Sequence, residues 1–291
     1  MSKPLEELVE LLALERIEEN LFRGQSRDLG WGTVFGGQVL GQALSAAEQT
    51  VPPERHVHSL NAYFLRPGNV SHPIVYDVDR IRDGGSFNTR RVVAIQRGEP
   101  IFNLAASFQK LEEGYDHQDP MPEVPPPESI PTDQERAALT PELPTRVREL
   151  AMAPGPFESR AIDVLDSPIH PTPRPPIRRV WVRAVGTLPD RPTLHRSLLA
   201  YASDRSFLTT ALFPHGAGWL TPGLQLASLD HVMWFHRPFR MDDWLLYVME
   251  SSTAQGSRGL THGRFFTRDG RLVASTAQEG LMRVRTKAPT S

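Results

Sequence analysis

The feature that most constrains the fold is a weak internal repeat, in which two segments far apart in the chain match at one constant offset without a gap. Residues 58–67 read HSLNAYFLRP, and residues 229–238 read LDHVMWFHRP. The identical pairs at this offset are Phe64 and Phe235, Arg66 and Arg237, Pro67 and Pro238, Tyr76 and Tyr247, Arg97 and Arg268, and Ala106 and Ala277. The period is far too long for a solenoid. We therefore expect two tandem copies of one small domain, with a chance match among common residue types as the alternative.

Each copy is predicted to be one helix followed by a run of strands. In the first copy, apolar residues recur at helical spacing from Val39 to Ala47. The expected strands there are Val57–Leu65, Ile74–Arg82, Phe87–Arg97 and Ile101–Gln109. In the second copy we expect a strand at Val180–Val185, a helix at Leu194–Leu212, and strands at Gln225–His236, Trp244–Ser251, Gly259–Thr267 and Leu272–Met282. Helix followed by antiparallel strands is an α+β unit.

Between the copies lies a proline-rich segment. Fifteen of the 27 prolines fall between Pro120 and Pro176, so little regular structure is expected there beyond two short helices at Gln134–Leu139 and Pro144–Met152. The predicted division is an N-terminal unit at residues 1–110, a connector at 111–178 and a C-terminal unit at 179–291. Residues 2–19 are predicted to form an amphipathic helix packed on the first unit.

Composition excludes several classes of function. The net charge is −2 and no basic run is present, which argues against nucleic-acid partners. The chain has no cysteine, so a disulfide framework, a thiolate zinc site and a cysteine nucleophile are all excluded. No apolar run approaches the ~20 residues of a membrane span, and the N-terminal residues do not resemble a signal peptide. A cytoplasmic protein without a membrane partner is the expectation.

The common catalytic motifs are missing, and Asp204 is the most informative polar residue. There is no G-x-S-x-G elbow, zinc-binding H-E-x-x-H helix, phosphate loop or G-x-G-x-x-G motif. Asp204 falls on the apolar stripe of the helix predicted at Leu194–Leu212, where burial would raise its pKa and suit it to general-base work. The alternative is that this helix breaks near Ser203 and Asp204 caps the next segment.

Other polar positions are less informative by themselves. Ser228 and Gln278 lie on predicted strands, where such residues are more often structural. Gly37 lies at the start of the helix predicted in the first copy of the repeat. It would leave backbone N–H groups free for a carbonyl oxygen or a phosphate, or would simply allow a tight turn. His56 and His58 share a strand face, but no third ligand is evident, so no metal site is expected.

Taken together, motifs spread over nearly the whole chain resemble those of the bacterial acyl-CoA thioesterase II family. They are LFRGQS at 21–26, VFGGQVLGQAL at 34–44, VHSLNAYFLRPG at 57–68, SFNTRRVVAIQRG at 86–98, YASDRSFL at 201–208, LDHVMWFHRPF at 229–239, WLLYVMES at 244–251 and ASTAQEGLMR at 274–283. The resemblance implies a double hotdog fold, in which each of two tandem units wraps an antiparallel sheet around a long helix. It also implies acyl-CoA as substrate, a role in fatty acid metabolism and a homo-oligomer.

The resemblance also implies which residues are functional. Asp204 matches the family's catalytic aspartate and Gln278 its glutamine, while Ser228 stands where the family has threonine. Asp204 would accept a proton from the attacking water, which Ser228 and Gln278 would hold. A backbone N–H of Gly37 or Gln38 is the candidate oxyanion donor, and His58 matches a histidine that we take to be structural or close to the substrate.

No metal, cofactor or covalent intermediate is required by this scheme. Two alternatives remain open at this stage. A hotdog hydratase or dehydratase acting on acyl-CoA would need an aspartate–histidine acid–base pair. A protein that binds acyl-CoA without turnover would use the same groove.

Overall fold

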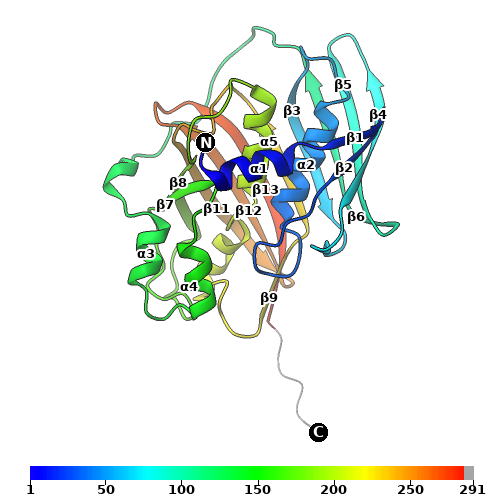
Figure 1. Cartoon of the computed structure of the whole chain (residues 1–291). Coiled ribbons are helices and arrows are strands. Elements are labelled where there is room, and N and C mark those ends of the chain that lie inside the picture. Colours follow the sequence, from blue (N-terminus) through cyan, green and yellow to red (C-terminus); the bar gives the residue numbers. More distant parts are fainter. Residues whose placement is uncertain (285–291) are drawn as a thin grey trace.

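The computed structural model describes residues 1–284, and its strands join into one 13-stranded sheet (Figure 1). The strands, in chain order, are β1 (Glu15–Glu18), β2 (Leu21–Gly24), β3 (His56–Phe64), β4 (Ile74–Asp83), β5 (Phe87–Gln96), β6 (Glu99–Gln109), β7 (Phe157–Ala161), β8 (Ile177–Ala184), β9 (Leu224–Ser228), β10 (Asp230–Phe235), β11 (Leu245–Gln255), β12 (Arg258–Thr267) and β13 (Leu272–Val284). Their order across the sheet is β1-β2-β4-β5-β6-β3-β10-β13-β12-β11-β8-β7, with β9 paired to β13. All pairings are antiparallel.

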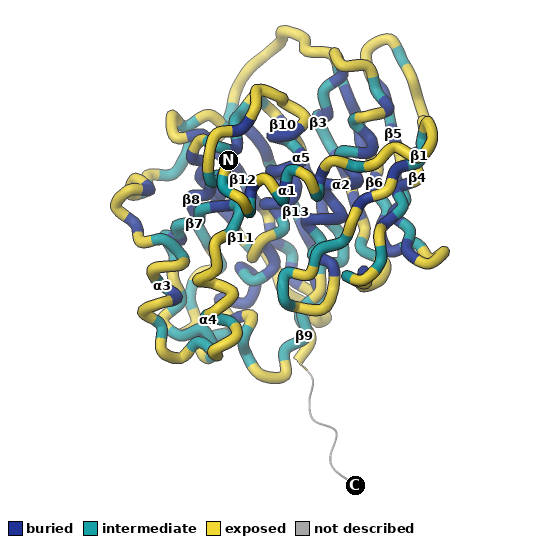
Figure 2. The backbone as a smooth tube through the Cα atoms, in the orientation of Figure 1, coloured by how far each residue is buried: buried dark blue, intermediate teal, exposed yellow. Residues whose placement is uncertain are grey.

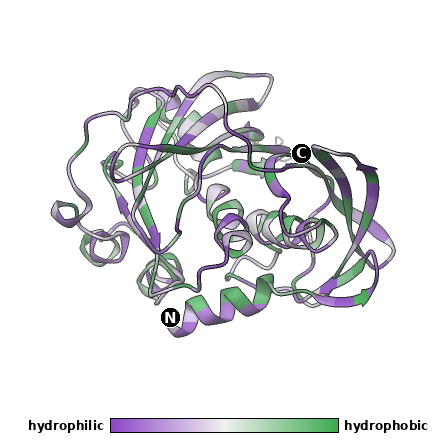
Figure 3. Cartoon of the chain, turned by 90° about the horizontal axis from the view of Figure 1, so that it is seen from above, coloured by the Kyte–Doolittle hydropathy of each residue, from purple (hydrophilic) through white to green (hydrophobic). Residues whose placement is uncertain are grey.

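The helices are fewer and mostly short. They are α1 (Lys3–Leu12), α2 (Gly36–Glu48), α3 (Asp133–Leu139), α4 (Thr145–Met152) and α5 (Pro192–Ser203), together with the 3₁₀ helices η1 (Pro127–Ser129) and η2 (Leu208–His215). Seen from above, the sheet curves around α2 and α5, and α1 lies along the open side (Figure 3). This is the double hotdog arrangement that the sequence predicts. No helix in residues 1–284 is long and apolar enough to cross a membrane.

The internal repeat corresponds to a structural repeat. Strands β4 and β11 begin at Ile74 and Leu245, and strands β5 and β12 begin at Phe87 and Arg258, so both pairs keep the offset of the sequence repeat. The central helices begin at Gly36 and Pro192, which are closer together in the chain than this offset. The second copy therefore carries extra residues in the segment between its helix and its main strands.

The two copies are joined through the edges of their sheets. β3 and β10 pair from Asp230 opposite Tyr63 to Trp234 opposite Ser59. The concave face of the combined sheet is covered by α2 and α5, which pack against each other, and the strand interiors are buried (Figure 2). A Cβ on Gly41 would lie 3.0 Å from the Ser197 carbonyl oxygen, so this glycine permits the close approach of the two helices.

The N-terminal helix is shorter than predicted. The helix expected over residues 2–19 ends at Leu12, and Ala13 already has extended backbone angles. Glu15–Glu18 instead forms β1, whose residues are all exposed and which pairs with β2. Because β2 continues the sheet beyond β4, backbone pairing at this edge overrides the helical preference of the segment.

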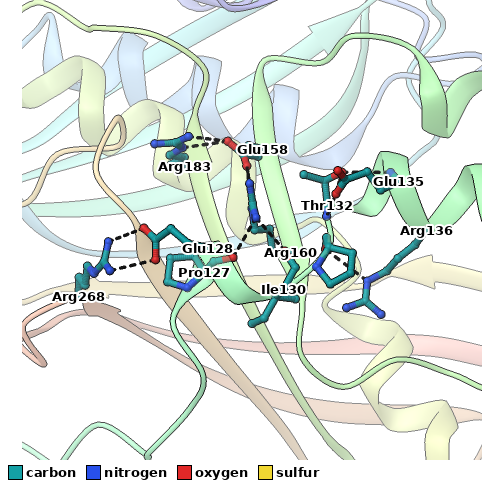
Figure 4. Close-up of polar contacts among 11 residues, drawn as sticks. Pro127, Glu128, Ile130, Thr132, Glu135, Arg136, Glu158, Arg160, Arg183 and Arg268 are labelled. Carbon is teal, nitrogen blue, oxygen red and sulfur yellow. Dashed lines mark hydrogen bonds and ion pairs between the residues drawn. The ribbon is translucent and has the colours of Figure 1, made fainter.

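The connector contains the two predicted helices, α3 and α4, but it also supplies the unpredicted edge strand β7. Ion pairs hold this segment to the second half of the sheet: Glu158 accepts from Arg160 and Arg183, and Glu128 pairs with Arg268 (Figure 4). The Trp181 indole N–H donates to the Pro125 carbonyl oxygen at 2.9 Å. The proline-rich segment is therefore anchored to the sheet at these points, although most of its residues are exposed or only partly buried.

Candidate active site

Asp204 lies at the C-terminal end of α5, before the segment that holds the extra residues of the second copy. The predicted helix through Leu212 is wrong in its second half, because α5 ends at Ser203 and η2 begins at Leu208. Ser206 has a left-handed backbone conformation (φ 59°), which the helix cannot continue through. The expected alternative of a break near Ser203 is confirmed. Asp204 does not cap the next segment, however, since no side chain caps η2.

Three donors from three elements converge on the Asp204 carboxylate. Ser228 at the end of β9 donates through Oγ at 3.3 Å, and Gln278 in β13 donates through Nε2 at 3.2 Å, both to Oδ1. The backbone N–H of Gly37 in the first turn of α2 also donates to this carboxylate. The structure thus brings together Asp204, Ser228, Gln278 and Gly37, which belong to both copies of the repeat and lie far apart in the sequence.

The two glycines at the start of α2 are required by this close approach. A Cβ on Gly36 would lie 2.7 Å from Asp204 Oδ2 and 2.9 Å from a ring carbon of Phe64. A Cβ on Gly37 would lie only 2.3 Å from the backbone carbonyl oxygen of Tyr201. The carboxylate therefore lies between the C-terminus of α5, whose dipole disfavours an anion, and the N-terminus of α2, whose dipole favours one.

Burial sets the protonation behaviour of the site. It raises the pKa of Asp204 from its ordinary value of 3.8 to about 6, and the hydrogen bonds from Gln278, Ser228 and Gly37 only partly offset this effect. The carboxylate is consequently mostly ionised at pH 7, yet it is a stronger base than a solvent-exposed aspartate. A carboxylate with this property can remove a proton from a water molecule held beside it.

His58 and Gln38 are also predicted substrate contacts, but their surroundings do not indicate a functional role. His58 Nε2 bonds Ser107 Oγ at 2.8 Å, and Ser107 alternates with the buried Ala106 and Phe108, so it lies on the sheet face away from the helices. Along β3, His58 is about 20 Å from Phe64, at ~3.3 Å per residue. Burial lowers its pKa. This placement gives no support to a substrate role for His58, which stays a prediction.

The Gln38 side chain is buried and holds the segment before α2. Its Nε2 donates to the Gln25 carbonyl oxygen at 3.0 Å, and its Oε1 accepts from the Arg27 backbone N–H at 3.2 Å. Its own backbone N–H donates to the Phe35 carbonyl oxygen at 3.0 Å. Its role as an oxyanion donor stays a prediction as well.

His231, which was not predicted to be functional, is fully buried next to Gln278. Its Nδ1 lies 3.1 Å from Gln278 Oε1, and its Nε2 lies 2.9 Å from Ser203 Oγ. The available signal was the alternation of this strand, which places His231 on the buried face with Met233 and Phe235. No group of three or more His, Asp or Glu side chains in the described part of the chain is arranged to hold a metal ion.

Known proteins resemble this chain over both of its halves. A model for acyl-CoA thioesterase matches residues 172–281, and one for the acyl-CoA thioesterase N-terminal domain matches residues 26–109. The chain is 45% identical to acyl-CoA thioesterase 2 of Haemophilus influenzae over 97% of this chain and 99% of that protein. It is 40% identical to human acyl-coenzyme A thioesterase 8, with 97% of this chain and 90% of that protein covered.

Solved structures give the same result. The acyl-CoA thioesterase II TesB2 from Mycobacterium marinum has a TM-score of 0.79 and 42% identity, over 97% of this chain and all of that chain. A tesB protein from Mycobacterium avium subspecies paratuberculosis has a TM-score of 0.80 and 31% identity, with the same coverage. With the two halves of the chain, the fold and the sequence all in agreement, the chain belongs to the acyl-CoA thioesterase family.

Proposed function

We propose that this protein hydrolyses acyl-CoA thioesters to free fatty acid and coenzyme A, with Asp204 as the general base. The observation that carries the proposal is the convergence of Ser228, Gln278 and Gly37 on a carboxylate whose pKa burial raises to about 6. Curated relatives covering nearly the whole chain are named acyl-CoA thioesterases, which supports the substrate class.

The proposed reaction needs no covalent intermediate. Asp204 takes a proton from a water molecule that Ser228 and Gln278 hold, and the water oxygen attacks the thioester carbonyl carbon. The tetrahedral oxyanion then collapses, the carbon–sulfur bond breaks, and the departing thiolate takes the proton from Asp204. The products are the carboxylic acid and coenzyme A, and the aspartate is regenerated.

Stabilisation of the oxyanion is assigned to a backbone N–H at the start of α2. Gly37 donates to Asp204 and Gln38 donates to the Phe35 carbonyl oxygen. Either group would have to exchange its present acceptor for the substrate oxygen. The N-terminus of α2 is suited to this role because its dipole and its backbone N–H groups favour negative charge.

The two alternatives make different products. A hydratase would need a histidine in contact with the aspartate, but His231 contacts the amide of Gln278 and the Ser203 hydroxyl. It would hydrate an unsaturated acyl-CoA and leave the thioester intact. A non-catalytic protein would bind acyl-CoA and release nothing.

The experiment is steady-state release of coenzyme A from saturated acyl-CoA of increasing chain length, measured with a thiol reagent. The absence of cysteine in the chain removes any thiol background from the protein. We expect turnover that falls by about 10²–10⁴-fold in Asp204→Asn, which is the usual contribution of a general base. Wild-type turnover in that variant would refute the assignment, and stoichiometric binding without release would indicate the non-catalytic alternative.

The proposal extends to the location, the metabolic role, the assembly and the domain organisation of the enzyme. We place the enzyme in the cytoplasm, in fatty acid metabolism, as a homo-oligomer without nucleic-acid or membrane partners. We also propose two functional units, residues 1–110 and 179–291, joined by the connector 111–178, with residues 285–291 lying outside the described structure. Size-exclusion chromatography with light scattering tests the oligomer, and a monomeric mass at micromolar concentration would contradict it.

A further inference from the structure

A hydrogen-bonded chain of three buried polar side chains runs from the Asp204 carboxylate into the core. Gln278 Nε2 lies 3.2 Å from Asp204 Oδ1, and Gln278 Oε1 lies 3.1 Å from His231 Nδ1. His231 Nε2 lies 2.9 Å from Ser203 Oγ, which is itself 2.9 Å from the Ala200 carbonyl oxygen. His231 and Ser203 are fully buried, and Gln278 is nearly so. Neither His231 nor Ser203 has a role in the proposed reaction.

Hydrogen-bond donors and acceptors along this chain can be assigned from one end. An ionised carboxylate only accepts hydrogen bonds, so Gln278 must present its amide nitrogen to Asp204. Its carbonyl oxygen then faces His231, and a carbonyl oxygen also only accepts. His231 Nδ1 must therefore carry a proton and donate to Gln278.

The other ring nitrogen follows from the charge of the imidazole. Burial lowers the pKa of His231 to about 4, so the ring is neutral at pH 7 and its Nε2 has a lone pair. Ser203 Oγ lies 2.9 Å from this nitrogen and 2.9 Å from the Ala200 carbonyl oxygen, and its single proton serves one of these two acceptors. His231 thus donates to Gln278 and Gln278 donates to Asp204, so both donors point toward the carboxylate.

No other charged group in the described residues hydrogen-bonds to this chain. Tyr247 donates to the Ser203 carbonyl oxygen from β11, and Phe207 lies against the His231 ring with centroids 5.7 Å apart. Burial raises the pKa of Tyr247 well above its ordinary value of 10.0, and it also raises the pKa of Tyr201 on α5. Both phenols therefore stay uncharged at neutral pH. Within this hydrogen-bonded chain of side chains, Asp204 is therefore the one group that titrates near neutral pH.

We propose that His231 is a positioning residue, which donates from Nδ1 to Gln278 Oε1 and so keeps the Gln278 amide nitrogen turned toward Asp204. Without this bond, the Gln278 side chain loses the contact that holds its carbonyl oxygen away from Asp204. Its carbonyl oxygen then competes for the place beside the carboxylate, and both the water and Asp204 lose a donor. This inference rests on the proposed role of Asp204 as general base.

The matched test variants are His231→Leu and His231→Asn. Leucine fills the space but removes the donor, whereas the asparagine amide nitrogen can occupy the position of Nδ1. We expect His231→Leu to lower kcat by about 10-fold, the effect of losing one buried hydrogen bond, with little change in KM, and His231→Asn to recover most of the loss. Equal losses in both variants would overturn the proposal.

A second readout does not depend on turnover. The hydrogen bond from Gln278 lowers the pKa of Asp204, so the ¹³C titration of that carboxyl should move upward in His231→Leu and return in His231→Asn. In a Gln278→Met background, His231→Leu should add no further shift, because the amide through which it acts is gone. An unchanged titration in His231→Leu, alongside reduced kcat, would show that His231 is only structural.

The wild-type protein provides a third test, which needs no folded variant. ¹⁵N chemical shifts of the His231 ring should show a protonated Nδ1 and an unprotonated Nε2 at pH 7. The opposite tautomer would overturn the proposal. If wild type releases no coenzyme A but the tautomer and the carboxyl titration are as expected, the proposed function fails while the positioning role stands.

Discussion

The raised pKa of Asp204 has a consequence for stability that can be tested separately from activity. The folded-state pKa is about 6 against an ordinary value of 3.8, so the folded protein binds this proton more tightly than the unfolded chain does. The protonated carboxyl therefore contributes stability to the folded protein. This contribution is fully present below the unfolded pKa of 3.8, and it is lost as the pH rises through the folded pKa of about 6. Ionised Asp204 therefore destabilises the fold at neutral pH.

The size of this effect follows from the two pKa values. The shift corresponds to a penalty of about 3 kcal/mol at pH 7, most of which is gone at pH 4. Asp204→Asn removes the ionisation but keeps the shape of the side chain. The free energy of unfolding of Asp204→Asn relative to wild type should therefore rise by roughly 2 kcal/mol between pH 4 and pH 7.

The assay is urea denaturation of both proteins at several pH values from 4 to 7.5. Other titrating groups are common to the two proteins and cancel in the difference, as does any fixed change in hydrogen bonding, such as an amide nitrogen facing the Gly37 N–H. A difference between the two proteins that does not vary with pH would refute the reasoning. It would mean that the carboxyl has an ordinary pKa in the folded protein.

Two further predictions concern the groups around the carboxylate. Ser228→Ala should reduce kcat less than Asp204→Asn does, because Gln278 still holds the water, while Ser228→Thr should remain close to wild type; an equal loss in Ser228→Ala would make the hydroxyl the dominant group. Gly37→Ala should lower the free energy of unfolding by about 1–3 kcal/mol and abolish turnover, since its Cβ would meet the Tyr201 carbonyl oxygen at 2.3 Å. Unchanged melting of Gly37→Ala would contradict this.

The fold was predictable because the signals were long and repeated. Strand β5, Phe87–Gln96, and strand β12, Arg258–Thr267, fall where the offset of the repeat and the flanking turn residues place them. Antiparallel strands joined by glycine-containing turns can be predicted from the local sequence, because the turn residues mark where each strand ends. The assignment of Asp204 and Gln278 to one site came from the family resemblance, since no periodicity links the end of a helix to a strand so much later in the chain.

The errors have a common physical origin, which is that long-range contacts decided the local structure. Glu15–Glu18 is a strand because β2 is available to pair with it, and Phe157–Ala161 is a strand because β8 is. The apolar pattern continues past Ser203, but the chain leaves the helix there, and the Asp204 carboxylate meets the N-terminus of α2. His231 was overlooked because a buried histidine on a strand resembles any other core residue until its hydrogen-bond partners are known.

The central claim is that Asp204, with its raised pKa, is the base that activates water. The most direct measurement is the pH dependence of kcat/KM for acyl-CoA hydrolysis from pH 4.5 to 8, since this quantity reports the pKa of groups in the free enzyme. We expect kcat/KM to fall below a midpoint near pH 6, and we expect this acidic limb to be absent from the residual activity of Asp204→Asn. Activity that stays constant down to pH 5, or the same acidic limb in Asp204→Asn, would contradict it.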